Sequence, residues 1–402
     1  MSGVGSTEPP GSGGGNLVER YLLLGLRLGR HVDGLVDAYY GPPELAARAE
    51  AEGRVDPAEL AREARALQER LDELDDARRR RWLGAQLDGL ETAARKLAGE
   101  DVPYREEVLR CYGVAPEPIA EEELREVHRR LDGLLPGDGD LVERYQAWRR
   151  AGEMPREAVL RACEAVAAEL RRRTAGLFPL PGGEDCAIEL VTGEPWAAFN
   201  YYLGGLRSRV VLNVDLPTRA NTLAELAAHE IYPGHHTEHS RKEAGLVRDR
   251  GFLEESLFLV CTPQSLVSEG IASIALDLLG EAAERACAEI LADLGAGYDV
   301  ERDRTIRDCV RPLGRVYDNV AELLHERGGT ADEALEHGLR WSLRPEPDVR
   351  KMIDFVTHPT WRAYAVTYSA GERLAGAWVG GEPARFERLL SEQLTTADLV
   401  GV

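Results

Sequence analysis

Apolar residues recur with a helical period over most of the chain. Leu17, Tyr21, Leu24 and Leu28 would share one face of a helix, and residues 59–97 are rich in alanine, leucine, glutamate and arginine, which is typical of one long helix or a helical hairpin. The same pattern recurs at residues 121–135, 141–151, 155–173, 281–294, 303–327, 331–340 and 347–356. We therefore expect a mainly α fold.

The hydrophobic period changes between residues 187 and 214. Three short segments, 187–191, 196–203 and 208–214, are rich in β-branched and aromatic residues and are separated by turns that contain glycine. They predict a small antiparallel β-sheet. An edge strand of such a sheet can pair with an extended peptide. The pattern is equally consistent with strands that only complete the core.

Four of the nine histidines follow this sheet, within residues 221–240. Thr222 and Glu225 have the spacing of a capping box, which predicts a helix that begins there and carries His229. A Pro-Gly pair at residues 233–234 should end or kink that helix, because proline cannot donate its backbone nitrogen to the preceding turn.

His229 and Glu230 form the first half of the zinc-peptidase signature, in which a glutamate acts on the water held by the metal. The second histidine of that signature is absent. A kink at the Pro-Gly pair would bring His235 or His236 back towards His229, and the sequence does not rank the two. The alternative is a group of surface histidines that binds no metal.

Glu269 is the expected third ligand. It lies in the most apolar stretch of the chain, residues 253–279, and a carboxylate buried there is costly unless it is paired or coordinates a metal. We expect His229, one or both of His235 and His236, and Glu269 to hold one Zn²⁺ per chain, with an open position for water. A salt-bridged or exposed Glu269 is the alternative.

The catalytic residues follow from this site. Glu230 would act as general base, and Tyr364, Tyr368 or His358 would stabilise the oxyanion. The two tyrosines have helical spacing, which is equally typical of core residues. The residues expected to contact the substrate are Tyr232, Asn200, Tyr201 and Arg362.

The charge and the apolar content of the chain limit the kinds of partner that we expect it to bind. The chain has 402 residues and a formal net charge of −21, which disfavours binding to nucleic acid. No run approaches the length of a membrane helix, and no signal peptide is evident, so we expect a cytoplasmic protein that does not bind membranes. Residues 1–16 read as a disordered tail, followed by a helical part, 17–180, and a catalytic part, 181–402, within one compact unit.

The motifs resemble the bacterial domain of unknown function 885 family. The resemblance rests on His229 to His236, on Ser268-Glu269-Gly270, on Tyr368 to Gly371 and on residues 37–42, Asp-Ala-Tyr-Tyr-Gly-Pro. It implies a multi-helix, zincin-like fold and a zinc metallopeptidase activity, broadly similar to carboxypeptidase Taq and other gluzincins. The chain departs from the family in its short length and at Ile271, where an aromatic residue is expected.

These features predict a zinc-dependent hydrolase that cleaves a peptide or a small amide. One alternative is a non-catalytic helical protein in which four ligands, for example with His239 as the fourth, close a structural metal site. Another is a zinc hydrolase that acts on non-peptide amides or esters.

Overall fold

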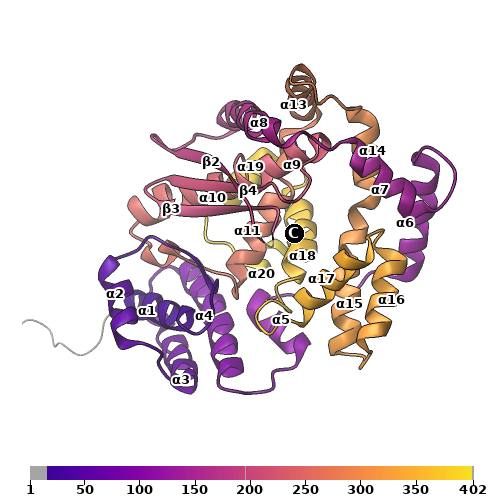
Figure 1. The fold of residues 1–402 in the computed structure, drawn as a ribbon. Helices are drawn as coiled ribbons and strands as arrows, with labels where there is room; N and C mark the ends of the chain where they lie inside the picture. Colours follow the sequence, from indigo (N-terminus) through magenta and orange to yellow (C-terminus); the bar gives the residue numbers. More distant parts are fainter. Residues whose placement is uncertain (1–15, 195, 401–402) are drawn as a thin grey trace, which may run out of the picture.

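Helices dominate the fold, and two small β-sheets are embedded among them (Figure 1). The computed structural model describes residues 16–194 and 196–400. Residues 1–15 of the expected tail lie outside this part, whereas Asn16 caps the first helix by accepting a hydrogen bond from the Glu19 N–H at 2.9 Å. The mainly α prediction is confirmed.

The α-helices are α1 (Leu17–Gly29), α2 (Pro43–Glu52), α3 (Pro57–Gln68), α4 (Ala77–Leu97), α5 (Tyr104–Tyr112), α6 (Glu121–Leu134), α7 (Leu141–Ala151), α8 (Arg156–Leu177), α9 (Ala220–Glu230), α10 (His235–Lys242), α11 (Pro263–Ser273), α12 (Ala275–Leu279), α13 (Glu281–Asp293), α14 (Val300–Val310), α15 (Val316–His325), α16 (Ala331–Trp341), α17 (Glu346–Thr357), α18 (Val366–Val379), α19 (Pro383–Ser391) and α20 (Thr396–Val400). The strands are β1 (Val36–Tyr39), β2 (Asp185–Val191), β3 (Ala198–Gly204), β4 (Arg207–Asn213) and β5 (Leu257–Leu259). No helix among the described residues is long and apolar enough to cross a membrane.

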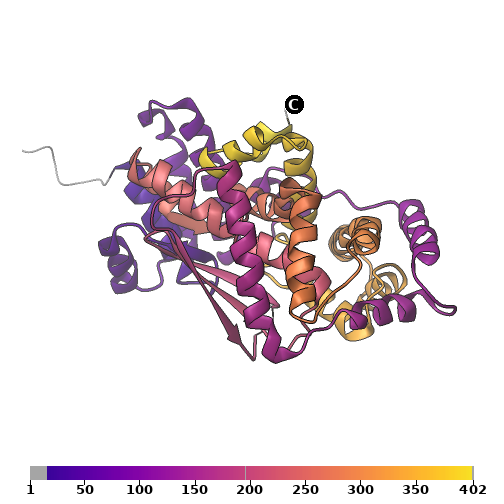
Figure 2. The same ribbon diagram turned by 90° about the horizontal axis from the view of Figure 1, so that it is seen from above.

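The expected small sheet lies directly before α9, and its strand order is β2-β4-β3. β3 and β4 pair antiparallel, as predicted, whereas β2 pairs with β4 in parallel, so the sheet is mixed. The side chains of Val210 and Leu212 pack into a core shared with α8 and α9, which lie against the sheet (Figures 1 and 2). β1 and β5 form a separate antiparallel pair.

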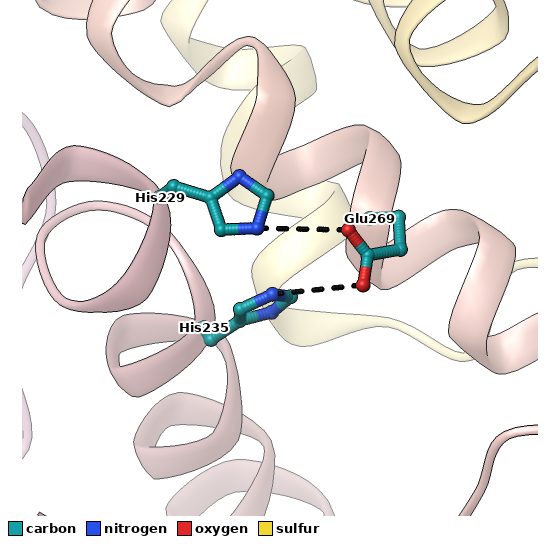
Figure 3. Close-up of side chains that lie close together, drawn as sticks. All are labelled: His229, His235 and Glu269. Carbon is teal, nitrogen blue, oxygen red and sulfur yellow. Dashed lines mark ion pairs between the residues drawn. The ribbon is translucent and has the colours of Figure 1, made fainter. Parts of the chain in front are cut away.

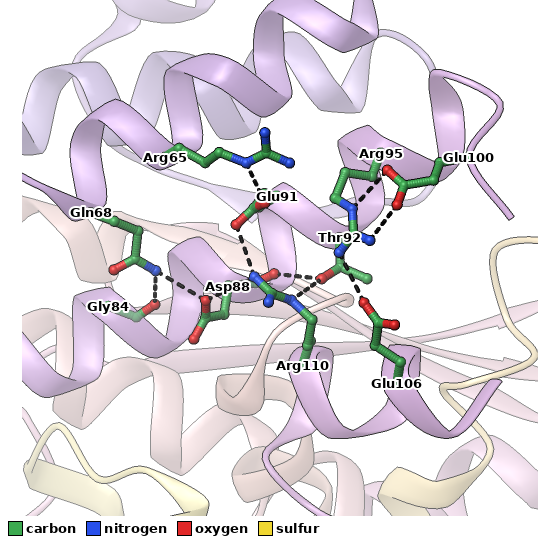
Figure 4. A network of polar contacts seen from close by, with 10 residues as sticks. All are labelled: Arg65, Gln68, Gly84, Asp88, Glu91, Thr92, Arg95, Glu100, Glu106 and Arg110. Atoms are coloured by element: carbon green, nitrogen blue, oxygen red, sulfur yellow. Dashed lines mark hydrogen bonds and ion pairs between the residues drawn. The ribbon is translucent and has the colours of Figure 1, made fainter. Parts of the chain in front are cut away.

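The helical run at residues 59–97 is a hairpin of α3 and α4, one of the two forms predicted. A polar network ties this hairpin to α5 (Figure 4). Glu91 on α4 accepts from Arg65 on α3 at 2.6 Å and from Arg110 on α5 at 2.8 Å. The network therefore fixes the three helices relative to one another.

Three buried hydrophobic clusters hold the chain together. One combines α5 and α6 with α11 and the helices from α14 onward, one combines α1, α3 and α4 with β5, and one combines α8 with β4, α9 and α13. Each cluster draws on elements from both sides of residue 180. The two parts distinguished in the sequence thus share their cores.

Candidate metal centre

The helix that carries His229 differs at its start from the prediction and ends as predicted. α9 begins at Ala220 with Arg219 as its N-cap, and no capping box forms between Thr222 and Glu225. It ends at Glu230, and α10 begins after the Pro-Gly pair. The helix is therefore interrupted between His229 and His235, two of the predicted metal ligands.

Gly234 allows the chain to turn back over the end of α9. Its N–H donates to the carbonyl oxygen of Ala228 at 2.9 Å. A Cβ atom at this position would collide with the carbonyl oxygens of Ala228 and His229, so only glycine fits. The turn brings the ring of His235 to 4.8 Å from the ring of His229, centroid to centroid.

His229, His235 and Glu269 form a group that could hold a metal ion (Figure 3). Glu269 Oε2 lies 3.6 Å from His229 Nε2, and Glu269 Oε1 lies 4.0 Å from His235 Nε2. Two ligand atoms that are each about 2.1 Å from one tetrahedral ion would be about 3.4 Å apart. The Oε2 atom of Glu269 is buried and has no hydrogen-bond partner among residues 16–194 and 196–400, as expected for an atom that contacts an ion.

A close helix crossing places Glu269. A Cβ atom on Gly270 of α11 would lie 2.5 Å from the carbonyl oxygen of Gly371 on α18, so the two backbones are almost in contact. Just before α18, Tyr364 donates its hydroxyl hydrogen to Glu269 Oε1 at 2.7 Å. The motif Ser268-Glu269-Gly270 thus meets the motif that ends at Gly371, and Tyr364 orients the carboxylate of Glu269.

Burial sets the protonation of the group. It lowers the pKa of His229 well below its usual value, assisted by the neighbouring His235, and it lowers the pKa of His235 to about 4. Burial also raises the pKa of Glu269 to about 7. Both imidazoles are therefore neutral at neutral pH, which is the form that coordinates metals.

A chain of hydrogen bonds orients His235. Ser268 donates its hydroxyl hydrogen to Glu238 Oε2 at 2.5 Å, and Lys242 donates to the other oxygen of Glu238 at 2.7 Å. The Ser268 oxygen is then free to accept from His235 Nδ1, which lies 3.1 Å away. This arrangement puts the ring proton on Nδ1 and leaves the lone pair of Nε2 facing Glu269.

His236 does not belong to this group, which corrects its prediction as a ligand. Neighbouring residues of a helix point about 100° apart, so His236 faces the sheet when His235 faces Glu269. Its side chain is fully buried, with Nδ1 2.8 Å from Ser208 Oγ and Nε2 2.8 Å from Glu184 Oε2. Both ring nitrogens are occupied.

Glu230 lies next to the group at the end of α9. Burial raises the pKa of its carboxyl group to about 8, and the charges of Glu269 and Asp37 add to this effect. Asn200, predicted to contact the substrate, is buried and donates to the backbone carbonyl of Glu230 at 2.6 Å. Asn200 therefore positions the end of α9.

Tyr368 lies beside Tyr364 and is partly exposed to solvent. Its ring lies 5.6 Å from that of Tyr364, its side chain is 47% exposed, and it lines a cleft of about 580 Å³. Burial of the hydroxyl end and the charges of Glu269 and Glu230 raise its pKa well above the usual value. The phenol thus keeps its proton and can donate a hydrogen bond.

His358 and Arg362, two site residues predicted near the C-terminus, do not reach the group. His358 is exposed at the end of α17, where its Nδ1 accepts from the N–H of Thr360 at 3.2 Å. Arg362 donates to Glu107 at 2.6 Å and to the carbonyl oxygen of Val102 at 2.8 Å. Its guanidinium group is engaged in holding α5, and its contact with substrate stays a prediction.

Tyr232 and Tyr201, for which substrate contact stays a prediction, have partners within the protein. The hydroxyl of Tyr232 donates to Glu184 at 2.6 Å, beside His236. Tyr201 alternates with the buried Asn200 along β3 and so points to the opposite face of the sheet, where Arg209 lies 4.7 Å from its ring.

Asp37 is a site residue that the chemical reasoning missed. The register of β1 against β5 shifts between Val36 and Ala38, so Asp37 occupies a β-bulge, a feature that can redirect a side chain. Its charge raises the pKa values of Glu230 and Glu269, and burial raises its own pKa to about 7. The only signal was its place in the motif at residues 37–42, which suggested a family resemblance and no role.

Comparison with known proteins identifies the fold only. No protein-family model matches the chain, and no curated protein matches it in sequence. Among solved structures, the chain is similar to a putative lipoprotein from Colwellia psychrerythraea, with a TM-score of 0.52 and 16% sequence identity over 89% of this chain and 68% of that one. At this identity the similarity concerns the fold and not the activity.

Proposed function

We propose that the protein is a zinc-dependent hydrolase that cleaves peptide bonds. The observation that carries this proposal is the buried Oε2 atom of Glu269, which lacks a hydrogen-bond partner in the described part of the chain and faces a neutral imidazole. A buried carboxylate oxygen in this state is costly, and a cation between Glu269 and the two histidines would remove the cost. Two imidazoles and one carboxylate are a donor set typical of catalytic zinc.

The number of ligands supports catalysis over a structural role. Structural zinc sites have four protein ligands, whereas catalytic sites have three and an open position. His239, the candidate fourth ligand, packs between the rings of Tyr202 and Phe258, at centroid distances of 5.0 and 5.1 Å. In the part of the chain that the structure describes, the group has three members.

The neighbouring residues suit a hydrolysis in which the metal supplies activation of water. The Glu230 carboxylate would take a proton from the attacking water and pass it to the leaving amine. A cation nearby would lower the raised pKa of Glu230, because it offsets the repulsion from Glu269. The Tyr368 hydroxyl would donate a hydrogen bond to the oxygen of the attacked carbonyl.

Metal analysis combined with one conservative variant tests this proposal. We expect about one zinc per chain in the wild type and none in His229→Ala or Glu269→Ala. Glu230→Gln should keep the zinc and lose about 10²- to 10⁴-fold in turnover of a peptide library. A wild type that takes up no zinc, or a Glu230→Gln variant with full activity, would contradict the proposal.

A further inference from the structure

A second cleft, of about 370 Å³, runs along α9 to the metal centre. Thr222, Glu225 and His229 line it, and their spacings of three and four residues place them on one face of the helix. Arg219, directly before α9, lines the other end. Arg219 precedes His229 by ten positions, and the helical rise over that interval corresponds to about 15 Å.

The far end of this cleft is lined by three arginines from separate elements. Arg149 comes from α7, Arg219 precedes α9, and Arg344 lies between α16 and α17. Within the described residues, neither Arg149 nor Arg344 forms an ion pair. Their guanidinium groups instead lie 6.0 Å from the ring of Tyr145 and 5.5 Å from the ring of Tyr317, respectively.

The positive charge of Arg219 is also poorly compensated by carboxylates. Within the described residues, its nearest carboxylate, that of Glu153, is 3.9 Å away, and its buried Nε has no hydrogen-bond partner. Burial lowers the pKa of Arg219, and the positive charge of Arg149 contributes to this shift. Arg311 in the same cleft differs, because it is bound by carboxylates, including that of Asp277 at 2.9 Å.

Weakly compensated positive charge is unusual in a chain whose formal net charge is −21. Among the described residues, Glu153 supplies the one carboxylate within 4.0 Å of these three guanidinium groups. The three groups therefore repel one another, and an anion among them would relieve that repulsion. The planar guanidinium group matches a carboxylate with two parallel hydrogen bonds.

We propose that this arginine cluster, Arg149, Arg219 and Arg344, binds a carboxylate group of the peptide substrate. The inference rests on the proposed function, since it places that carboxylate relative to a scissile bond at the metal centre. An extended peptide covers about 3.3 to 3.6 Å per residue, so about 15 Å corresponds to four or five residues. The anionic group lies that far from the bond that is cleaved. Its source is a chain terminus or an acidic side chain.

Binding of matched peptides tests the inference separately from catalysis. The probes are three N-acetylated alanine hexapeptides: one ends in a carboxylate, one ends in an amide, and one ends in an amide but has glutamate as its last residue. Affinity for the zinc-loaded full chain is measured by calorimetry on Glu230→Gln, and turnover is measured on the wild type by mass spectrometry.

The free-acid peptide should bind at least about tenfold more tightly than the amide, as expected for hydrogen bonds to a charged group. Arg149→Gln combined with Arg344→Gln should abolish that difference and leave binding of the amide unchanged. When Arg149→Lys replaces Arg149→Gln in this double variant, the positive charge is kept, and part of the affinity difference between the free acid and the amide should return. Arg105→Gln, which removes an exposed charge on α5 away from the cleft, is the matched control and should change nothing.

The glutamate peptide identifies the source of the carboxylate. Binding as tight as that of the free acid shows that a side chain suffices, and binding as weak as that of the amide assigns the site to a chain terminus. Equal affinity for all three peptides overturns the inference. Charge-dependent binding without turnover would contradict the hydrolase proposal and leave the carboxylate site in place, so the two failures are distinguishable.

Discussion

His235 and His236 are neighbours in sequence and both lie close to a glutamate, but their surroundings are opposite in character. His236 has both ring nitrogens occupied, and its partner Glu184 also accepts from Tyr232 and from Arg171. His235 has its Nδ1 occupied, whereas its Nε2, which faces Glu269 at 4.0 Å, has no hydrogen bond to any residue that the structure describes.

The difference fits the proposal that one cluster serves folding and the other binds a metal. Buried polar groups in a folded protein are nearly always paired, and the His236 cluster, consisting of His236, Glu184, Tyr232 and Ser208, obeys that rule. The metal group breaks it at Glu269 Oε2. Under the proposed function, the fully paired cluster stabilises the fold, and the unpaired oxygen of the other is free to contact a ligand that is not part of the chain.

Replacing each histidine by alanine should have the largest effects, and it should separate a role in stability from a role in metal binding. His236→Ala removes one partner of a buried pair, which should lower the free energy of unfolding by about 3 to 5 kcal/mol and leave zinc uptake at 10 °C intact. His235→Ala should abolish zinc uptake with little loss of stability of the metal-free protein. Urea denaturation of the metal-free proteins and metal analysis after dialysis measure the two properties.

The comparison fails if His236→Ala loses its metal while it remains folded, as judged by circular dichroism. It also fails if His235→Ala retains one zinc per chain. In either case the two histidines would not have the separate roles that we propose for them.

The His236 cluster should also govern stability in acid. Burial opposes ionisation of Glu184, but hydrogen bonds from His236, Tyr232 and Arg171 hold its pKa at about 2, below the usual 4.5. Its contribution is therefore complete above pH 4.5 and lost as the pH falls towards 2. The shift corresponds to about 3 kcal/mol.

Glu184→Gln provides the test, because glutamine cannot titrate. Between pH 5 and pH 2 its unfolding free energy should fall by about 3 kcal/mol less than that of the wild type, while the other carboxylates affect both proteins alike. Parallel curves for the two proteins would contradict this assignment.

Sequence reasoning found the parts of the site that depend on local rules. The helical period predicted the fold class, and the inability of proline to continue a helix predicted the break after α9. The cost of burying a carboxylate singled out Glu269. These inferences need only residue types and spacings, and the structure places His229, His235 and Glu269 together as they require.

Other parts depend on directions in space that no spacing determines. His235 and His236 could not be ranked, because the path of the chain at Gly234 decides which ring faces Glu269. Arg362 and Tyr232 have the chemistry of substrate-binding residues, but their partners Glu107 and Glu184 are 255 and 48 residues away along the chain. The arginine cluster likewise joins three distant elements and has no local signature.

Replacing the two serines that contact these histidines should have the smallest effect, and the two replacements form the most closely matched pair of variants. Ser268→Ala removes the acceptor that orients His235 and should weaken zinc binding about 10- to 100-fold, as is usual when a group behind a metal ligand is lost. Ser208→Ala removes the corresponding contact of His236 and should cost about 1 kcal/mol of stability with no change in zinc affinity. Competition with a fluorescent zinc chelator measures the affinity, and urea denaturation measures the stability. Equal zinc affinities in the two variants would show that the hydrogen bond to Ser268 does not prepare His235 for a metal, and the distinction between the two histidines would then rest on Glu269 alone.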